Sequence, residues 1–381
     1  MLDVVELTQR LVQASGLSGD ERASADVAES AMAELGFREV LSDSYGSVIG
    51  LIGPAETDIA ALFDGHTDVV PATGEWSVDP YEGLIRDGRI FGRGSTDMKG
   101  GLAAAICGVA NAAATAPLER QIAVSASVME ETIEGVALAK ILNDHKPDCV
   151  VICEPSSLEL RIAQRGRMEI CLTIHGKSAH AAFPDGSINP IEGSARALGM
   201  LNDLRFKADP LLGRGVLVPV SIISDPFPSP SMVPVSVTIN FDRRTVPGDT
   251  RESVLEEVRD CLAGCNDLDY SLTLQADKAT TYTGVELHPE RNFPPWKIAE
   301  DHPLSLACID ALETAGVPVK IGAWAACTNG SESAGRRNIP TIGIGPGDIK
   351  DAHTVDESIL VDQLERAVEV YSALALNLAK R

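Results

Sequence analysis

Two histidines and four acidic residues of this 381-residue chain each lie just after an apolar run or on the loop beyond one. They are His66, Asp97, Glu130, Glu131, Glu154 and His353. Imidazole nitrogens and carboxylate oxygens are zinc ligands. Three carboxylates and two imidazoles suit two divalent metal ions that share one carboxylate, and such a pair polarises a carbonyl and lowers the pKa of a bridging water. A carboxylate left over beside that water can act as the general base.

His66 also stands two residues before Asp68, at the end of the apolar run 59–63. The second ring nitrogen of a metal-binding histidine is usually held by a neighbouring group, which fixes the tautomer. Taken alone, this spacing favours an ordinary histidine at a strand end. The other candidate ligands reverse that preference.

Composition limits the classes of partner. The net charge is −23 and the pI is near 4.6, which disfavours nucleic acid and anionic membranes, because both attract basic surfaces. No apolar run approaches the roughly 18 residues of a membrane span, and the acidic start is unlike a secretory signal. The eight cysteines form no Cys-x-x-Cys pair, so we expect a cytoplasmic protein with reduced thiols.

The elements that position the candidates alternate between strand and helix. Apolar strands are expected at 59–63, 121–128 and 149–152, and each is followed by acidic or histidine residues. Helices are expected between them at 101–114 and 133–144, and again at 303–315 and 360–378, around a strand at 339–344. This order predicts an α/β fold with a doubly wound, mostly parallel sheet, which places ligands at strand ends.

The middle of the chain has a different pattern. Between 168 and 285 the order is β-α-β-β-α-β, which predicts an inserted ferredoxin-like α+β domain. The catalytic domain would then comprise 1–167 and 286–381. Length alone allows two domains with a sizeable core.

Five motifs in this order resemble the di-zinc aminoacylase and carboxypeptidase family. They are GHTDVVP, GRGSTDMKGG, MEE, CEP, and GPGD with a later AHT-DE. That family includes acetylornithine deacetylase, succinyl-diaminopimelate desuccinylase and bacterial glutamate carboxypeptidase. The resemblance covers nearly the whole chain, including the insertion, which would be a lid and dimerisation domain.

The resemblance implies a role for each candidate ligand. One metal would be bound by His66 and Glu154, the other by Glu131 and His353, and Asp97 would bridge them. The ions would be zinc, with cobalt as the alternative.

The same resemblance implies roles for neighbouring residues. Asp68 would hold His66, and Glu130 would be the general base. The peptide bond between Asp97 and Met98 is expected to be cis.

Three further segments resemble parts of the family that contact substrate. GKSAHAAFPDGSINPI would carry His180 to the developing oxyanion, from the other subunit of a homodimer formed through the lid domain. FDRRTVPGD would supply Arg244, with Arg243 as its rival, to grip a substrate carboxylate. CTNGSESAGRRNIPTIGIGPGD resembles the substrate loop and implies contacts from Asn329 and Gly330, although many relatives have Asp near Asn329.

We therefore expect a metal-dependent amidohydrolase that removes the acyl group from an N-acylated amino acid by attack of a water between the metals. Its substrate would be a small N-acyl amino acid or short peptide with a free carboxylate. A metallo-exopeptidase, either carboxypeptidase or dipeptidase, shares every catalytic residue and is the first alternative. A catalytically silent binding protein is a remote alternative, because such a protein should lose Glu130 or a ligand and this chain retains them all.

Overall fold

A computed structural model describes residues 2–380, and their contacts divide them into two compact units. The first consists of 2–164, Lys278–Pro289 and 296–380, and the second of Arg165–Asp277 and Glu290–Pro295. The first unit includes a hairpin that lies inside the predicted insertion, formed by β15 (Ala279–Thr280) and β16 (Glu286–Leu287). The reason is a local contact: the Tyr282 hydroxyl donates to the Gly46 carbonyl at 2.8 Å.

The first unit is built on one nine-stranded sheet. Its strand order is β1 (Glu39–Ser42), β2 (Val48–Ile52), β6 (Gln121–Ser127), β3 (Ile59–His66), β7 (Val150–Ile152), β20 (Thr341–Gly343), β8 (Leu160–Gln164) and β18 (Trp296–Lys297), with β19 (Ile321–Trp324) also paired to β8. β3 runs parallel to both β6 and β7, and β20 runs parallel to β7. The central strands are therefore parallel, and the predicted α/β class is confirmed.

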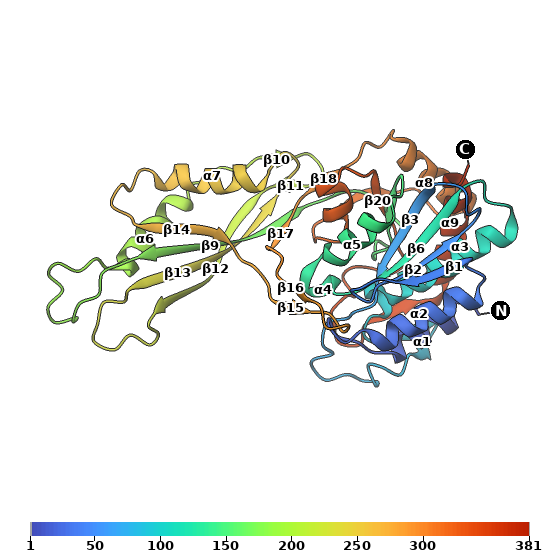
Figure 1. The fold of residues 1–381 in the computed structure, drawn as a ribbon, viewed down its shortest axis with the longest axis horizontal. Helices are drawn as coiled ribbons and strands as arrows, with labels where there is room; N and C mark the ends of the chain where they lie inside the picture. The colour runs from blue at the N-terminus through green and yellow to red at the C-terminus, as the bar shows by residue number, and fades with distance from the viewer. Residues whose placement is uncertain (1, 381) are drawn as a thin grey trace. The chain divides into compact units, whose positions relative to one another are not determined.

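Helices cover both faces of this sheet (Figure 1). One face packs on α1 (Val4–Gln13), α2 (Arg22–Glu34), α3 (Gly100–Thr115), α8 (Pro303–Thr314) and α9 (Val361–Leu378), and the other on α5 (Val136–Asp144). Side chains alternate between the faces, as strand geometry requires. Phe63 and Val124 join the first core, whereas Leu62 and Ala123 join the second, and all four are fully buried.

Shorter elements complete the first unit. They are α4 (Glu130–Ile133), the turn segments η1 (Ser95–Lys99) and η2 (Ser331–Arg336), and a three-stranded sheet of β4 (Leu84–Arg86), β5 (Arg89–Phe91) and β21 (Ser358–Leu360). The predicted helix 133–144 is divided at Gly135, whose positive φ of 78° ends α4 before α5 begins. None of the helices described between residues 2 and 380 is long and apolar enough to cross a membrane.

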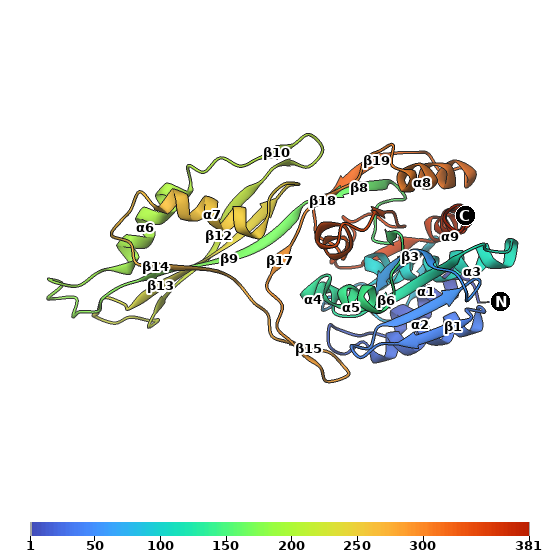
Figure 2. The same cartoon turned by 45° about the horizontal axis from the view of Figure 1, so that its top comes forward.

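The second unit is an antiparallel sheet with two helices on one face (Figure 2). Its elements follow in the order β9 (Gly166–His175), α6 (Pro190–Leu201), β12 (Val216–Asp225), β13 (Ser236–Thr245), α7 (Arg251–Leu262) and β14 (Tyr270–Leu274). The strand order β12-β13-β9-β14 is that of a ferredoxin-like fold. β17 (Asn292–Phe293) also pairs with β9, and β10 (Ala208–Asp209) with β11 (Gly213–Arg214) forms a small hairpin.

Candidate metal centre

The predicted ligands of the first unit come from neighbouring strands and the loops beyond them. His66 is the last residue of β3, Glu154 follows β7, and Glu130 begins α4 just after β6. These strands are parallel neighbours, so their carboxyl ends lie at one edge of the sheet. Asp97 lies in η1, where its backbone leaves helical angles, and the Asp97–Met98 peptide bond is cis, as predicted.

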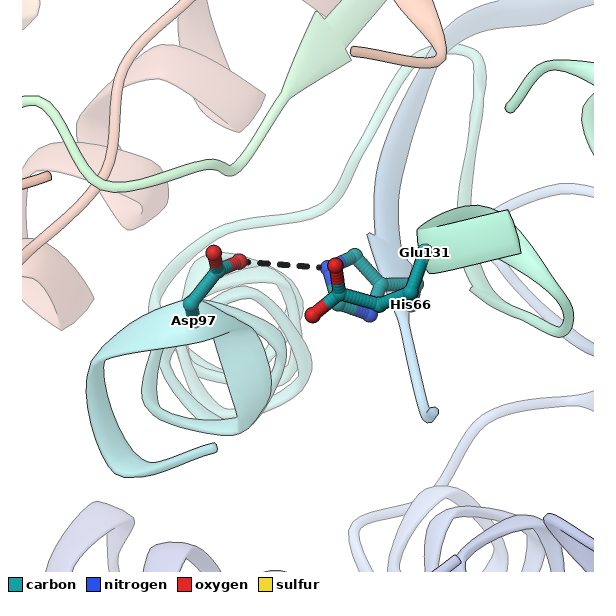
Figure 3. Close-up of side chains that lie close together, drawn as sticks. All are labelled: His66, Asp97 and Glu131. Carbon is teal, nitrogen blue, oxygen red and sulfur yellow. Dashed lines mark hydrogen bonds and ion pairs between the residues drawn. The ribbon is translucent and has the colours of Figure 1, made fainter. Parts of the chain in front are cut away.

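Asp97 lies between the two histidines. Its Oδ1 atom is 3.3 Å from Nε2 of His66, and its Oδ2 atom is 3.2 Å from Nε2 of His353. Figure 3 shows the carboxylate of Asp97 directed toward the ring of His66, with Glu131 beside that ring. One carboxylate thus presents a separate oxygen to each imidazole.

Each imidazole also faces a second carboxylate. Oε1 of Glu154 is 3.5 Å from Nε2 of His66, and Oε1 of Glu131 is 3.1 Å from Nε2 of His353. Glu130 lies farther away, with Oε2 at 3.9 Å from Nε2 of His66. Donors close enough together to hold an ion form two groups, His66 with Asp97 and Glu131, and His66 with Glu130 and Glu154. Because Asp97 also faces His353, the whole donor set suits two divalent ions.

Asp68 holds three of these residues in place. The Nδ1 atom of His66 lies 2.9 Å from the carbonyl oxygen of Asp68, so this nitrogen donates and Nε2 is directed at the carboxylates. The two carboxylate oxygens of Asp68 accept the backbone N–H groups of Glu130 and Glu131, each at 3.0 Å. Ser18 donates its hydroxyl to the same carboxylate at 2.7 Å.

The electrostatics of the cluster favour bound cations. Burial raises the pKa of Glu130 and Glu154 well above the usual range, and it also raises the pKa of Glu131. Burial would likewise raise the pKa of Asp97, but hydrogen bonds from His353 and His66 outweigh it and lower that pKa. Buried carboxylates this close repel one another unless a positive charge lies among them. The donor set therefore fits two divalent metal ions.

The carboxylates of the cluster also favour the protonated forms of the two histidines. Hydrogen bonds with Asp97 and Glu131 raise the pKa of His353 to about 10. Burial disfavours protonated His66, but its contacts with Asp68 and Asp97 prevail and raise its pKa. In the absence of metal, protons on the imidazoles supply part of the missing charge.

Among the buried charged residues near the cluster that were not predicted from the sequence are Glu21, Arg93 and Glu357. Glu21 is fully buried, and its Oε1 accepts the N–H groups of Gly19 at 2.9 Å and Met129 at 3.0 Å. Met129 directly precedes Glu130 and has a positive φ of 62°, so Glu21 fixes the backbone where α4 begins. The other two are Arg93 and Glu357, which lie beside Asp97. Glu357 and Arg93 belong to motifs that the sequence did single out, AHT-DE and GRGSTDMKGG, but spacing gave no sign of their contact.

Two predicted residues lie in the second unit. His180 is exposed, and its Nδ1 accepts the N–H of Ala182 at 3.0 Å. Arg244 is paired through two N–H groups with Asp242, at 2.8 and 3.1 Å. Its rival Arg243 is buried against the ring of Phe206 and is paired with Asp249, which gives it a structural role.

The remaining predicted residues, Asn329 and Gly330, have contacts inside the first unit. The amide of Asn329 donates to Asp64 at 2.8 Å and to Ser127 at 3.1 Å, and its oxygen accepts the N–H of Gly135 at 2.7 Å. A side chain at Gly330 would meet the indole of Trp296 at 2.6 Å. Both residues thus shape the loop before η2, and a contact with substrate stays a prediction.

Comparison with known proteins gives a consistent set of relatives. Residues 62–377 match peptidase family M20/M25/M40. The uncharacterized protein YgeY of Escherichia coli strain K12 is 32% identical over 383 residues, which cover 98% of this chain and 94% of YgeY. A succinyl-diaminopimelate desuccinylase of Wolbachia pipientis is 25% identical over 393 residues, which cover 99% of this chain and 93% of the relative.

Solved structures show the same fold, and one of them serves as an example. It is the YXEP protein of Bacillus subtilis, described as a dinuclear metal binding peptidase from the M20 family. The two chains superpose with a TM-score of 0.73 at 14% sequence identity, over 98% of this chain and 96% of the other.

Proposed function

This chain belongs to peptidase family M20/M25/M40, and on that premise we propose that it removes the acyl group from an N-acylated amino acid. It is a metal-dependent hydrolase that acts on amides. The observation that carries the proposal is the position of Asp97, whose two oxygens face Nε2 of His66 and Nε2 of His353. This geometry suits hydrolysis at a pair of metal ions, and the family match makes the hydrolysed bond an amide.

Two zinc ions are the proposed cofactor. His66 and Glu154 would hold one ion, His353 and Glu131 the other, and Asp97 would bridge them. Imidazole and carboxylate donors suit zinc, and cobalt accepts the same set. When bound, the ions polarise the amide carbonyl and make water a stronger nucleophile at neutral pH.

Glu130 is the proposed general base. Its carboxylate lies in one group with His66 and Glu154 but is farther than Glu154 from Nε2 of His66, at 3.9 Å against 3.5 Å, so we assign Glu154 to the metal and Glu130 to proton transfer. The carboxylate of Asp68 accepts the backbone N–H of Glu130, and this hydrogen bond fixes the backbone from which the Glu130 side chain extends. Glu130 would take a proton from the attacking water and pass it to the nitrogen that leaves.

His180 is the proposed donor to the carbonyl oxygen as negative charge develops there. Because its Nδ1 accepts the N–H of Ala182, the neutral ring carries its proton on Nε2. That N–H is the donor which an oxyanion needs. Arg244 is the proposed clamp for the substrate carboxylate because a guanidinium suits a carboxylate; in this structure two of its N–H groups donate to Asp242. Asn329 and Gly330 would shape the loop beside the substrate.

A homodimer formed through the second unit is part of the proposal. β12 is an edge strand of its sheet, and Val218, Val220 and Ile222 on it are 47%, 62% and 56% exposed. An edge strand with exposed apolar side chains favours pairing with another chain. We propose a cytoplasmic location because the eight cysteines form no Cys-x-x-Cys pair and four of them, Cys107, Cys149, Cys153 and Cys308, are buried.

The alternative is a metallo-exopeptidase, which the name of the matching family and the Bacillus subtilis peptidase favour, whereas the Wolbachia desuccinylase favours a deacylase. The test is a panel of N-acyl amino acids and dipeptides, given to the zinc-loaded and cobalt-loaded protein, with release of the free amine measured. We expect the highest kcat/KM for an N-acyl amino acid. A dipeptide that is cleaved more than tenfold better would reassign the chain as an exopeptidase. A protein that holds both metals and cleaves neither class would be a binding protein.

A further inference from the structure

Glu357 is a buried carboxylate that contacts the backbone of the proposed bridging ligand. It is 1% exposed, and its Oε1 accepts the N–H groups of Thr96 at 2.9 Å and Asp97 at 3.0 Å. Two N–H groups on one oxygen fix the orientation of the peptide planes that lead into Asp97. The direction in which the Asp97 side chain leaves the backbone is therefore set in part by Glu357.

Arg93 binds the other oxygen of Glu357. The two side chains form an ion pair of 2.5 Å, and Arg93 is 2% exposed. The guanidinium also lies over the ring of Trp76, at 5.2 Å from its centroid, and donates to the Pro71 carbonyl at 3.5 Å. Burying such a pair is costly, and removing one partner leaves an uncompensated buried charge. A buried ion pair of this kind is suited to holding the neighbouring Asp97 in a fixed position.

The pair also connects the two segments that carry Asp97 and His353. Glu357 follows His353 by four residues, and Arg93 precedes Asp97 by four. Around the pair, the N–H of Gly92 donates to the Glu357 carbonyl at 2.9 Å, and the Thr96 hydroxyl donates to the Ser358 carbonyl at 3.1 Å. β21 and β5 continue the contact as paired strands. The bridging carboxylate and the histidine of the second ion therefore share one support.

We propose that Arg93 and Glu357 are positioning residues that hold Asp97 so that each of its oxygens faces one metal ion. The inference rests on the proposed two-metal function and adds residues that bind no metal themselves. A bridging carboxylate tolerates little rotation, since a turn that favours one ion withdraws an oxygen from the other. Substituting a residue that holds a metal ligand in place typically lowers metal affinity by about 10–100-fold.

The test measures binding of cobalt(II) by its visible absorption, in the full chain, without relying on turnover. Glu357→Gln keeps an amide oxygen for the N–H groups of Thr96 and Asp97 but leaves Arg93 without a carboxylate. We expect it to weaken binding of one of the two cobalt ions by about 10–100-fold and to alter the cobalt spectrum. The double variant Arg93→Met/Glu357→Gln also removes the unpaired guanidinium. Its cobalt binding should stay weak, which would show that the loss comes from the missing ion pair and not from an unpaired buried charge.

A matched control is Arg89→Met. Arg89 contacts Ser358 and Asp351 in the same region but donates to neither Asp97 nor Glu357. It should lower thermal stability while leaving both cobalt affinities and the spectrum unchanged. Wild-type cobalt affinities and spectrum in Glu357→Gln would overturn the inference and leave the pair a purely structural one.

Two further outcomes are informative. If Glu357→Gln does not fold, the folded double variant decides. Weak cobalt binding and an altered spectrum would show that an amide oxygen cannot replace the ion pair, which supports the positioning role. Wild-type cobalt affinity and spectrum would reject it. Binding of fewer than two cobalt ions by the wild type contradicts the proposed function itself, and is thereby separate from a failure of this inference.

Discussion

The backbone N–H of Glu130 donates to the carboxylate of Asp68 at 3.0 Å. The same aspartate, through its carbonyl oxygen, holds Nδ1 of His66 at 2.9 Å. The proposed base and a proposed metal ligand are thus fixed by one residue, although Glu130 begins α4 and His66 ends β3. Accurate placement of a site by supporting hydrogen bonds is what catalysis requires.

Metal removal should destabilise the protein more at pH 8 than at pH 6. Without metal, the raised pKa values of Glu130, Glu154 and His353 mean that the folded chain binds protons more tightly than the unfolded chain. Stability from such groups is present below their unfolded pKa and is lost as pH rises through the folded pKa, by at most about 1.4 kcal/mol per pH unit for each group. The metal-loaded protein becomes more stable as pH rises, because protons compete less with the metal ions for the ligands.

The measurement is the difference in Tm between zinc-loaded and chelated protein at the two pH values. It should grow from pH 6 to pH 8. A difference that stays constant or shrinks would show that the buried carboxylates do not bind the ions. The lowered pKa of Asp97 acts in the opposite direction, but only under more acidic conditions.

Glu21→Gln should change the pH dependence of stability. Burial, followed by the charge of Asp68, raises the pKa of Glu21 from 4.5 to about 7. The wild type therefore loses stability as pH rises between these values, whereas glutamine keeps an acceptor for the N–H groups of Gly19 and Met129 and has no charge to bury. Relative to wild type, the variant should gain on the order of 1–3 kcal/mol in the free energy of unfolding between pH 5 and pH 8.

Urea unfolding of the chelated proteins at both pH values measures this gain. Glu29→Gln, on the exposed face of α2, is the matched control and should follow the wild type. Equal differences from wild type at pH 5 and pH 8 would mean that Glu21 is ionised throughout and contributes by packing alone.

Activity should need a free carboxylate on the substrate. If Arg244 is the clamp, a methyl ester loses a charge-assisted contact that is worth about 2–3 kcal/mol, so its kcat/KM should be roughly 30–150-fold lower than that of the acid. Arg244→Met should lower kcat/KM for the acid toward that for the ester, while Arg205→Met, which contacts only nearby carbonyls, should not. Equal values for acid and ester in the wild type would remove Arg244 from the site.

Mixed dimers should regain activity if His180 serves the partner's site. Glu130→Ala and His180→Ala chains would each be nearly inactive. Refolded together in equal amounts, about half of the dimers are mixed, and each mixed dimer has one site with both residues intact. Recovery of roughly one quarter of wild-type activity is expected. No recovery, with mixed dimers demonstrated, would mean that His180 acts within its own chain or not at all.

Residue types at strand ends were enough to predict which candidate ligands the fold brings together. The apolar runs before His66 and Glu154 are short and buried except at Ile59, and parallel strands of this kind bring their carboxyl ends together. Periodicity also predicted the ferredoxin-like order of the second unit. The strands β8, β18 and β19 were not predicted, because segments of two to five residues carry too little pattern.

The supporting contacts could not be predicted from spacing. Glu357 and Thr96 are separated by 261 residues, and Glu21 and Met129 by 108, so only the folded chain shows that they meet. Asn329 illustrates the converse. Its motif resembles a substrate loop, yet its amide is occupied by Asp64 and Ser127, because a buried polar side chain needs partners inside the protein.

The most direct test of the account is Glu130→Gln, measured for both metal content and turnover on the best substrate of the panel. Glutamine has nearly the same shape and cannot accept the proton, so two metals per chain should remain while turnover falls by at least about 10²–10⁴-fold. Glu131→Gln is the matched control and should lose metal first, because Glu131 contacts His353. Near wild-type turnover by Glu130→Gln with both metals bound would contradict the account and make Glu131 the candidate base.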